Sequence, residues 1–96
     1  MNIDFNKNGS ELIVVIDGRL DTITAPELET LLGKNYEETT SITFDCEKLS
    51  YISSAGLRVL LTVHKRMKGA MKLINVNELV MEVFEMTGFA DIWVIE

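Results

Sequence analysis

Segments with the length of buried strands alternate with helical patterns along this chain, and that order constrains its fold more than any other feature. Strand-like apolar runs occur at Leu12 to Ile16, Ile42 to Cys46, Met71 to Val76 and Ile92 to Ile95. A helical pattern lies between each successive pair. Because a helix between two strands makes a crossover, the strands are predicted to be parallel, with the helices packed on the sheet. The expected fold class is α/β, with a small and mostly parallel sheet of four to five strands.

The N-terminal part is predicted to form an antiparallel hairpin. Ile3 to Phe5 and Leu12 to Ile16 are apolar runs separated by a polar segment. Within that segment, the Asn8-Gly9 pair supplies the positive φ angles of a tight turn. Gly18 is expected to end the second strand.

Three helices are predicted from capping residues and from apolar positions at helical spacing. The first starts with Thr24 as its cap, Pro26 in the first turn and Glu27 reaching back as in a capping box. The second runs from Leu57 to Gly69, and the third from its cap Asn77 to Gly88. The core-facing stripes are expected to be Leu28, Leu31 and Leu32; then Leu57, Leu60, Leu61, His64 and Met67; then Leu79, Val80, Val83 and Phe84. The outer face of the second helix is expected to carry Arg58, Thr62, Lys65 and Arg66.

Composition indicates one folded domain over residues 1–96 and disfavours several classes of partner. The hydrophobic content is 47% and the formal net charge is −6. Nucleic acids and anionic membrane surfaces are recognised by clustered Lys and Arg, so neither is expected as a partner. No apolar run approaches a membrane span and no signal peptide is recognisable, so we expect a cytoplasmic protein without membrane insertion. The single Cys46 is interpreted as a small core residue.

No residue pattern predicts an enzyme, a cofactor or a metal centre. A nucleophile elbow needs a glycine where Ile52 stands. The sole histidine, His64, follows Ser54 on the same helix at about 15 Å, too far for a general base. His64 is therefore interpreted as a packed core or interface residue. Three acids near strand ends are interpreted as solvated or capping groups rather than metal ligands: Asp17, Asp21 and Asp45.

The run Ile52 to Leu57, which reads Ile-Ser-Ser-Ala-Gly-Leu, is the most informative local motif. It lies where strand character gives way to helix. A serine there can cap the helix, and the free N–H groups of a helix start also favour a phosphate. An ordinary cap and a regulatory phosphorylation site therefore both remain open. Because functional loops follow the carboxyl ends of parallel strands, residues 18–22 and 51–56 are predicted to converge, with Asp21 near Ser54.

Markers along nearly the whole chain resemble the STAS domain family, and within it the small bacterial anti-sigma factor antagonists. The markers are Gly18-Arg19-Leu20-Asp21-Thr22 with Ala25-Pro26, Asp45 to Ile52, Ser53-Ser54-Ala55-Gly56-Leu57, Asn75, and Phe84 to Phe89. The resemblance implies the STAS fold and a regulatory protein rather than an enzyme.

The resemblance also implies a phosphorylation switch. In the family, the partner anti-sigma factor is a serine kinase that phosphorylates a serine at the head of this helix. Alignment on Gly56 places the acceptor at Ser54, with Ser53 as the runner-up. The chain departs from the family motif at two positions: Ser53 stands where the family usually has aspartate, and Ala55 stands where it has Ser or Thr. The unphosphorylated protein is expected to bind the kinase and release the sigma factor. Phosphorylation breaks that complex, and a PP2C-type phosphatase restores the free serine.

The surface expected to bind the kinase combines the first loop, the serine turn and the outer face of the second helix. Its residues are Asp21, Thr22, Ser53, Ala55, Gly56, Arg58 and Thr62. One alternative is a constitutive STAS adaptor subunit of a transport or sensory assembly, with Ser54 only a cap. Weak nucleotide binding is a third interpretation, disfavoured because the chain has no phosphate-binding loop motif.

Overall fold

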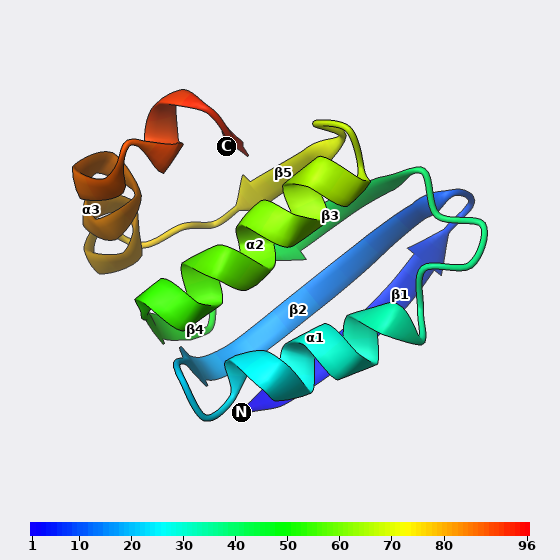
Figure 1. Cartoon of the computed structure of the whole chain (residues 1–96), viewed down its shortest axis with the longest axis horizontal. Helices are drawn as coiled ribbons and strands as arrows, with labels where there is room; N and C mark the ends of the chain where they lie inside the picture. The colour runs from blue at the N-terminus through cyan, green and yellow to red at the C-terminus, as the bar shows by residue number, and fades with distance from the viewer.

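The computed structural model describes all 96 residues, and its elements follow the predicted alternation (Figure 1). They are β1 (Asn2–Asn8), β2 (Glu11–Leu20), α1 (Ala25–Gly33), β3 (Ser41–Asp45), β4 (Leu49–Ile52), α2 (Ser54–Arg66), β5 (Met71–Ile74), α3 (Glu78–Thr87), the 3₁₀ helix η1 (Phe89–Asp91) and β6 (Val94–Ile95). The sheet order is β1-β2-β3-β5-β6, with β4 paired to β2. Only the β1–β2 pair is antiparallel. The α/β class and the N-terminal hairpin are confirmed, and the sheet has six strands rather than four or five.

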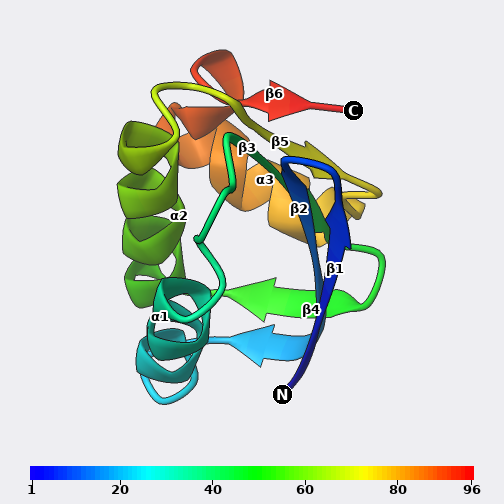
Figure 2. The same ribbon diagram turned by 90° about the vertical axis from the view of Figure 1, so that its right-hand side faces the viewer.

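Two helices cover one face of this sheet. Figures 1 and 2 show α1 and α2 side by side on that face, while α3 lies beyond one end of the sheet, next to β4. None of the helices is long and apolar enough to cross a membrane. The arrangement leaves the starts of α1 and α2 together at one end of the molecule.

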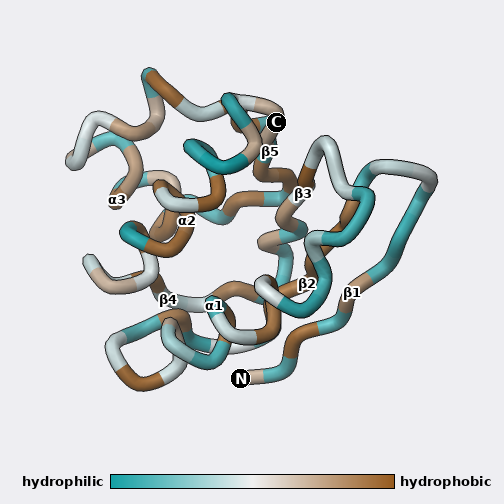
Figure 3. The backbone as a smooth tube through the Cα atoms, turned by 45° about the vertical axis from the view of Figure 1, so that its right-hand side comes forward, coloured by the Kyte–Doolittle hydropathy of each residue, from teal (hydrophilic) through white to brown (hydrophobic).

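A single core lies between the sheet and the helices. The buried positions of β2 alternate along the strand, as in Leu12, Val14 and Ile16. Leu28 and Leu32 of α1 are fully buried over them. Figure 3 shows the hydrophobic colour along β2, β3 and β5. Each such side chain contributes about 1.5–3 kcal/mol by leaving water, so this layer fixes where the helix starts lie.

The strands depart from the prediction in the second half of β2. Gly18 does not end the strand: it takes a φ of 115°, the register shifts there, and β2 continues to Leu20. This extension pairs with β4, a strand that the prediction leaves inside a connection. At the hairpin only Gly9 has positive φ, because Asn8 still belongs to β1. The last two strands are shorter than predicted, since β5 ends at Ile74 and β6 has two residues.

The helices also start and end differently from the prediction. The expected capping box of α1 is wrong, because neither Thr24 nor Glu27 makes a side-chain cap hydrogen bond. Helix α2 begins at Ser54, earlier than Leu57, and its C-cap is Met67 rather than Gly69. The Asn77 cap of α3 is confirmed by a 2.8 Å hydrogen bond from the Val80 N–H, and Gly88 ends that helix in the left-handed conformation.

The buried stripes differ from the prediction on all three helices. On α1, Leu31 is only half-buried. On α2, Val59 and Val63 are buried, whereas Leu61 and His64 are only half-buried. On α3, Leu79 is exposed although the pattern placed it on the core side.

Candidate functional site

The serine motif lies at the junction between β4 and α2. Ile52 ends β4 in the core, and the Ser53 N–H donates to the Leu20 carbonyl at 2.9 Å. Ser53 is the N-cap residue, with an extended backbone, and Ser54 is the first residue of the helix. The end of β2 thus fixes the position from which α2 starts.

The two serines of this junction have different surroundings. The Ser53 side-chain oxygen is enclosed and has no hydrogen-bond partner, and it does not cap the helix. The ordinary-cap interpretation is therefore wrong for Ser53, and Ser54, as the first helical residue, is not in the cap position either. The Ser54 residue is exposed. Ser54 is thus exposed to solvent at the head of α2, whereas the Ser53 hydroxyl is enclosed.

Gly56 is required by the close approach of α2 to β2. A Cβ at this position would lie 2.8 Å from Leu20 Cγ and 2.8 Å from Ile52 Cγ1, and 3.0 Å from the Leu20 carbonyl oxygen. Gly56 is buried. It belongs to the site as a residue that positions Ser54, and it does not offer a surface to a partner.

Asp21 organises the loop between β2 and α1. Its Oδ1 atom accepts hydrogen bonds from the N–H groups of Ile23 at 3.0 Å and Thr24 at 3.1 Å. The Thr24 N–H contact, followed by that of Ile23, lowers the pKa of the Asp21 carboxyl below its ordinary value, against an opposing effect of burial. Asp21 therefore holds the turn that leads into α1, while Thr24 occupies the N-cap position without a side-chain cap hydrogen bond.

Pairing of β2 with β4 joins this loop to the serine junction. Arg19 is opposite Tyr51 in the register. The Arg19 guanidinium lies 4.2 Å from the centre of the Tyr51 ring, and its Nε is 3.7 Å from Asp21 Oδ2. The predicted convergence of the two loops is thus observed. Arg19 and Tyr51 lie within the two segments predicted to converge, but the prediction did not single out either residue or their contact.

A hollow of about 270 Å³ lies between α1 and the start of α2. Its walls are Thr22, Ala25, Pro26, Glu29, Ala55, Arg58 and Val59. Three predicted surface residues therefore meet here: Thr22, Ala55 and Arg58. Thr62 is exposed one turn further along α2, where its hydroxyl donates to the Arg58 carbonyl at 3.0 Å, and it lies outside the hollow.

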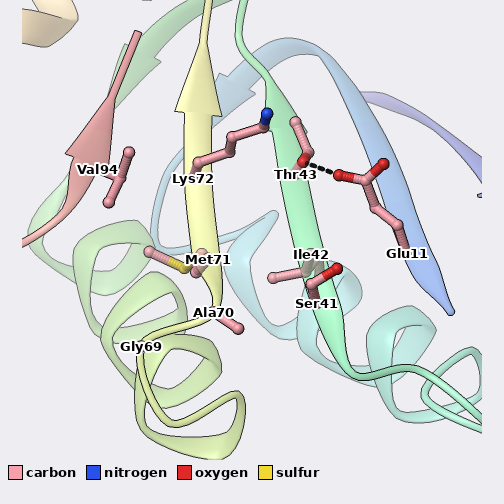
Figure 4. Close-up of a pocket in the computed structure, with 9 residues that line it drawn as sticks. All are labelled: Glu11, Ser41, Ile42, Thr43, Gly69, Ala70, Met71, Lys72 and Val94. Carbon is pink, nitrogen blue, oxygen red and sulfur yellow. Dashed lines mark hydrogen bonds between the residues drawn. The ribbon is translucent and has the colours of Figure 1, made fainter.

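A second hollow, of about 310 Å³, opens at the other end of the strands (Figure 4). It lies at the amino ends of β3 and β5, where the Thr43 hydroxyl donates to Glu11 Oε2 at 2.7 Å. Lys72 and Val94 complete its walls. Because Ser54 follows the carboxyl end of β4, this hollow is not part of the serine site.

The remaining reactive side chains are engaged elsewhere. Asp45 Oδ1 accepts from the Glu47 N–H and from Asn75 Nδ2, both at 3.1 Å. Burial, with a smaller effect of Asp45, raises the pKa of the Cys46 thiol to about 12, so it stays protonated. The structure contains no group of three or more His, Cys, Asp or Glu side chains placed so that they could hold a metal ion.

Comparison with known proteins identifies the family to which this geometry belongs. The STAS domain family model matches residues 2–96. The chain belongs to the STAS domain family. Among curated relatives, the anti-sigma-B factor antagonist of Bacillus subtilis is 32% identical over 95 residues, covering 96% of this chain and 87% of the relative. BtrV of Bordetella bronchiseptica is 34% identical over 97 residues, covering 97% of this chain and 84% of the relative.

The fold of this STAS domain is also found among solved structures. The Bacillus cell fate determinant SpoIIAA in its phosphorylated form superposes with a TM-score of 0.74 at 16% identity. That match covers 99% of this chain and 91% of the SpoIIAA chain. At this level of identity the comparison shows a shared fold.

Proposed function

We propose that this STAS domain is an anti-sigma factor antagonist controlled by phosphorylation of Ser54. In its unphosphorylated form it binds an anti-sigma factor serine kinase and thereby releases the sigma factor. The observation that carries the proposal is the contrast at the head of α2, where Ser54 is exposed and the Ser53 hydroxyl is enclosed. The anti-sigma-B factor antagonist, which is 32% identical across nearly the whole chain, supports the regulatory role.

The location of Ser54 suits a residue that must change charge without unfolding the domain. A phosphoryl group adds about −1.5 to −2 charge at neutral pH. At the N-terminus of α2 this charge meets the positive end of the helix dipole and unpaired N–H groups, which favour it. The fold is therefore expected to survive phosphorylation, so that the change acts on binding.

The same charge is unfavourable inside a protein interface. Covering Ser54 with a partner removes water from the phosphate, and an unpaired buried charge costs several kcal/mol. A loss of that size lowers affinity more than a hundredfold. Phosphorylation would in this way dissociate the kinase, and a PP2C-type phosphatase would restore binding.

The test is to incubate the protein with ATP and each anti-sigma-type serine kinase encoded in the same genome, and to locate the phosphate by mass spectrometry. We expect phosphate on Ser54, and no incorporation in Ser54→Ala. Ser53→Ala is the matched control and should still be phosphorylated. Phosphate on Ser53, or normal incorporation in Ser54→Ala, would refute the assignment. Binding of a partner without any phosphorylation would favour the constitutive adaptor.

A further inference from the structure

An apolar side chain stands out on the loop between β2 and α1. Ile23 is 85% exposed, which makes it the most exposed of the six large hydrophobic residues on the surface. The residues around it in the loop are polar: Asp21, Thr22 and Thr24. An isoleucine exposed to this extent contributes little to the core and presents its apolar surface to solvent.

The backbone that carries Ile23 is held in place by a dense set of hydrogen bonds. The Ile23 N–H donates to Asp21 Oδ1 at 3.0 Å, and the Ala25 N–H donates to the Asp21 carbonyl at 2.8 Å. The Thr24 hydroxyl donates to the Arg19 carbonyl at 2.7 Å and accepts from the Asp21 N–H at 2.9 Å. The side chain is thus displayed from a fixed turn, which reduces the entropy lost when a partner binds it.

Ile23 is continuous with the surface around Ser54. Its neighbour Thr22 lines the same hollow as Ala55 and Arg58 of α2. On its other side, Asp21 contacts Arg19, which in turn covers the Tyr51 ring. Figure 1 shows the loop after β2 and the start of α2 at the same end of the molecule. A protein that encloses Ser54 for phosphoryl transfer therefore extends over a region next to Ile23.

We propose that Ile23 is the apolar anchor by which this domain docks on the serine kinase, inserting into a hydrophobic pocket of that protein. The inference rests on the proposed function and adds the residue that supplies the apolar contact. A kinase is favoured over a membrane because the domain carries a net charge of −6, which an anionic lipid surface repels. Burying an isoleucine side chain accounts for roughly a tenfold to hundredfold gain in affinity.

The experiment measures the dissociation constant of the kinase that phosphorylates the parent protein, by calorimetry with ADP present. Ile23→Ala should weaken binding at least tenfold, and Ile23→Leu should bind within about threefold of the parent. The matched control is Val94→Ala, because Val94 is also an exposed aliphatic residue but lies at the opposite end of the strands. All variants should melt within about 2 °C of the parent, since these side chains are exposed.

The outcomes separate this inference from the proposed function. If Ile23→Ala binds like the parent while Ser54→Asp loses binding, the anchor is wrong and the phosphorylation switch stands. If no kinase binds the parent protein or phosphorylates Ser54, the proposed function fails and the anchor fails with it. If Ile23→Ala instead abolishes self-association of the parent in light scattering and leaves kinase binding intact, a second copy occupies this surface and the anchor on the kinase is refuted.

Discussion

Phosphorylation of Ser54 is expected to stabilise the folded domain, in part through Arg58. Arg58 lies four residues after Ser54 on α2, so the two side chains share one face of the helix. Arg58 is exposed and forms no ion pair within the chain. Genetically encoded phosphoserine can be placed at position 54 without a kinase.

The magnitude follows from two effects. An anion at a helix N-terminus contributes about 0.3–1 kcal/mol, and an opposite-charge pair four residues apart about 0.2–0.5 kcal/mol. The phosphate carries up to twice the charge of a carboxylate, so the sum is about 1–2 kcal/mol. For a domain of this size, that raises the melting temperature by roughly 4–16 °C. By these values, the ion pair with Arg58 contributes about a third of the stabilisation that phosphorylation produces.

Calorimetry of the phosphoserine and parent proteins at low and high salt measures this gain. Arg58→Ala should lose the pair contribution from the phosphorylated form and change the unmodified form little. Lys65→Ala is the matched control, because Lys65 is an exposed cation nearer the other end of the same helix. High salt should reduce the gain, since both groups are exposed. A melting temperature that falls on phosphorylation, or a gain unaffected by Arg58→Ala, would refute this reasoning.

Two further predictions concern the residues that position the serine. Gly56→Ala should destabilise the domain by about 1–3 kcal/mol, because its Cβ meets Leu20 and Ile52 at 2.8 Å; unchanged urea denaturation would contradict the packing. The lowered pKa of Asp21 implies stability that is present above its ordinary value of 3.8 and is lost as pH falls through the lower folded-state value. Acid titration of Asp21→Asn should lack this contribution, and a profile identical to the parent would refute it.

The order of strands and helices was predictable because the spacing of apolar residues in the sequence indicates each element. Strand β4 was not predictable, because only its first and last residues are buried and its sequence shows no alternation. It forms because β2 continues past the bulge at Gly18 and offers an edge for pairing, which is a tertiary effect. Missing β4 also displaced the predicted start of α2 from Ser54 to Leu57.

The site was predictable in its location and less so in its individual roles. The expected parallel topology indicated the convergence of the two loops, whereas the hydrogen bonds of Asp21 in the turn and the packing of Gly56 came from the structure. The exposure of Ile23 could not be predicted, because an apolar residue is expected in the core unless the turn that displays it is known. Burial of the Ser53 oxygen likewise depends on contacts that local residues do not specify.

The place of Arg58 suggests how one modification can act on binding twice. In the unmodified protein its guanidinium is unpaired and borders the hollow beside Ala55, where it is free to contact a partner. A phosphate on Ser54 would draw that guanidinium toward the head of α2, because charge-assisted hydrogen bonds to phosphate are strong. The partner would then meet a new negative charge and would also lose a positive group from the same surface. An ion pair between the Ser54 phosphate and Arg58 would thus stabilise the fold and weaken binding of the partner, which is the combination that a reversible switch requires.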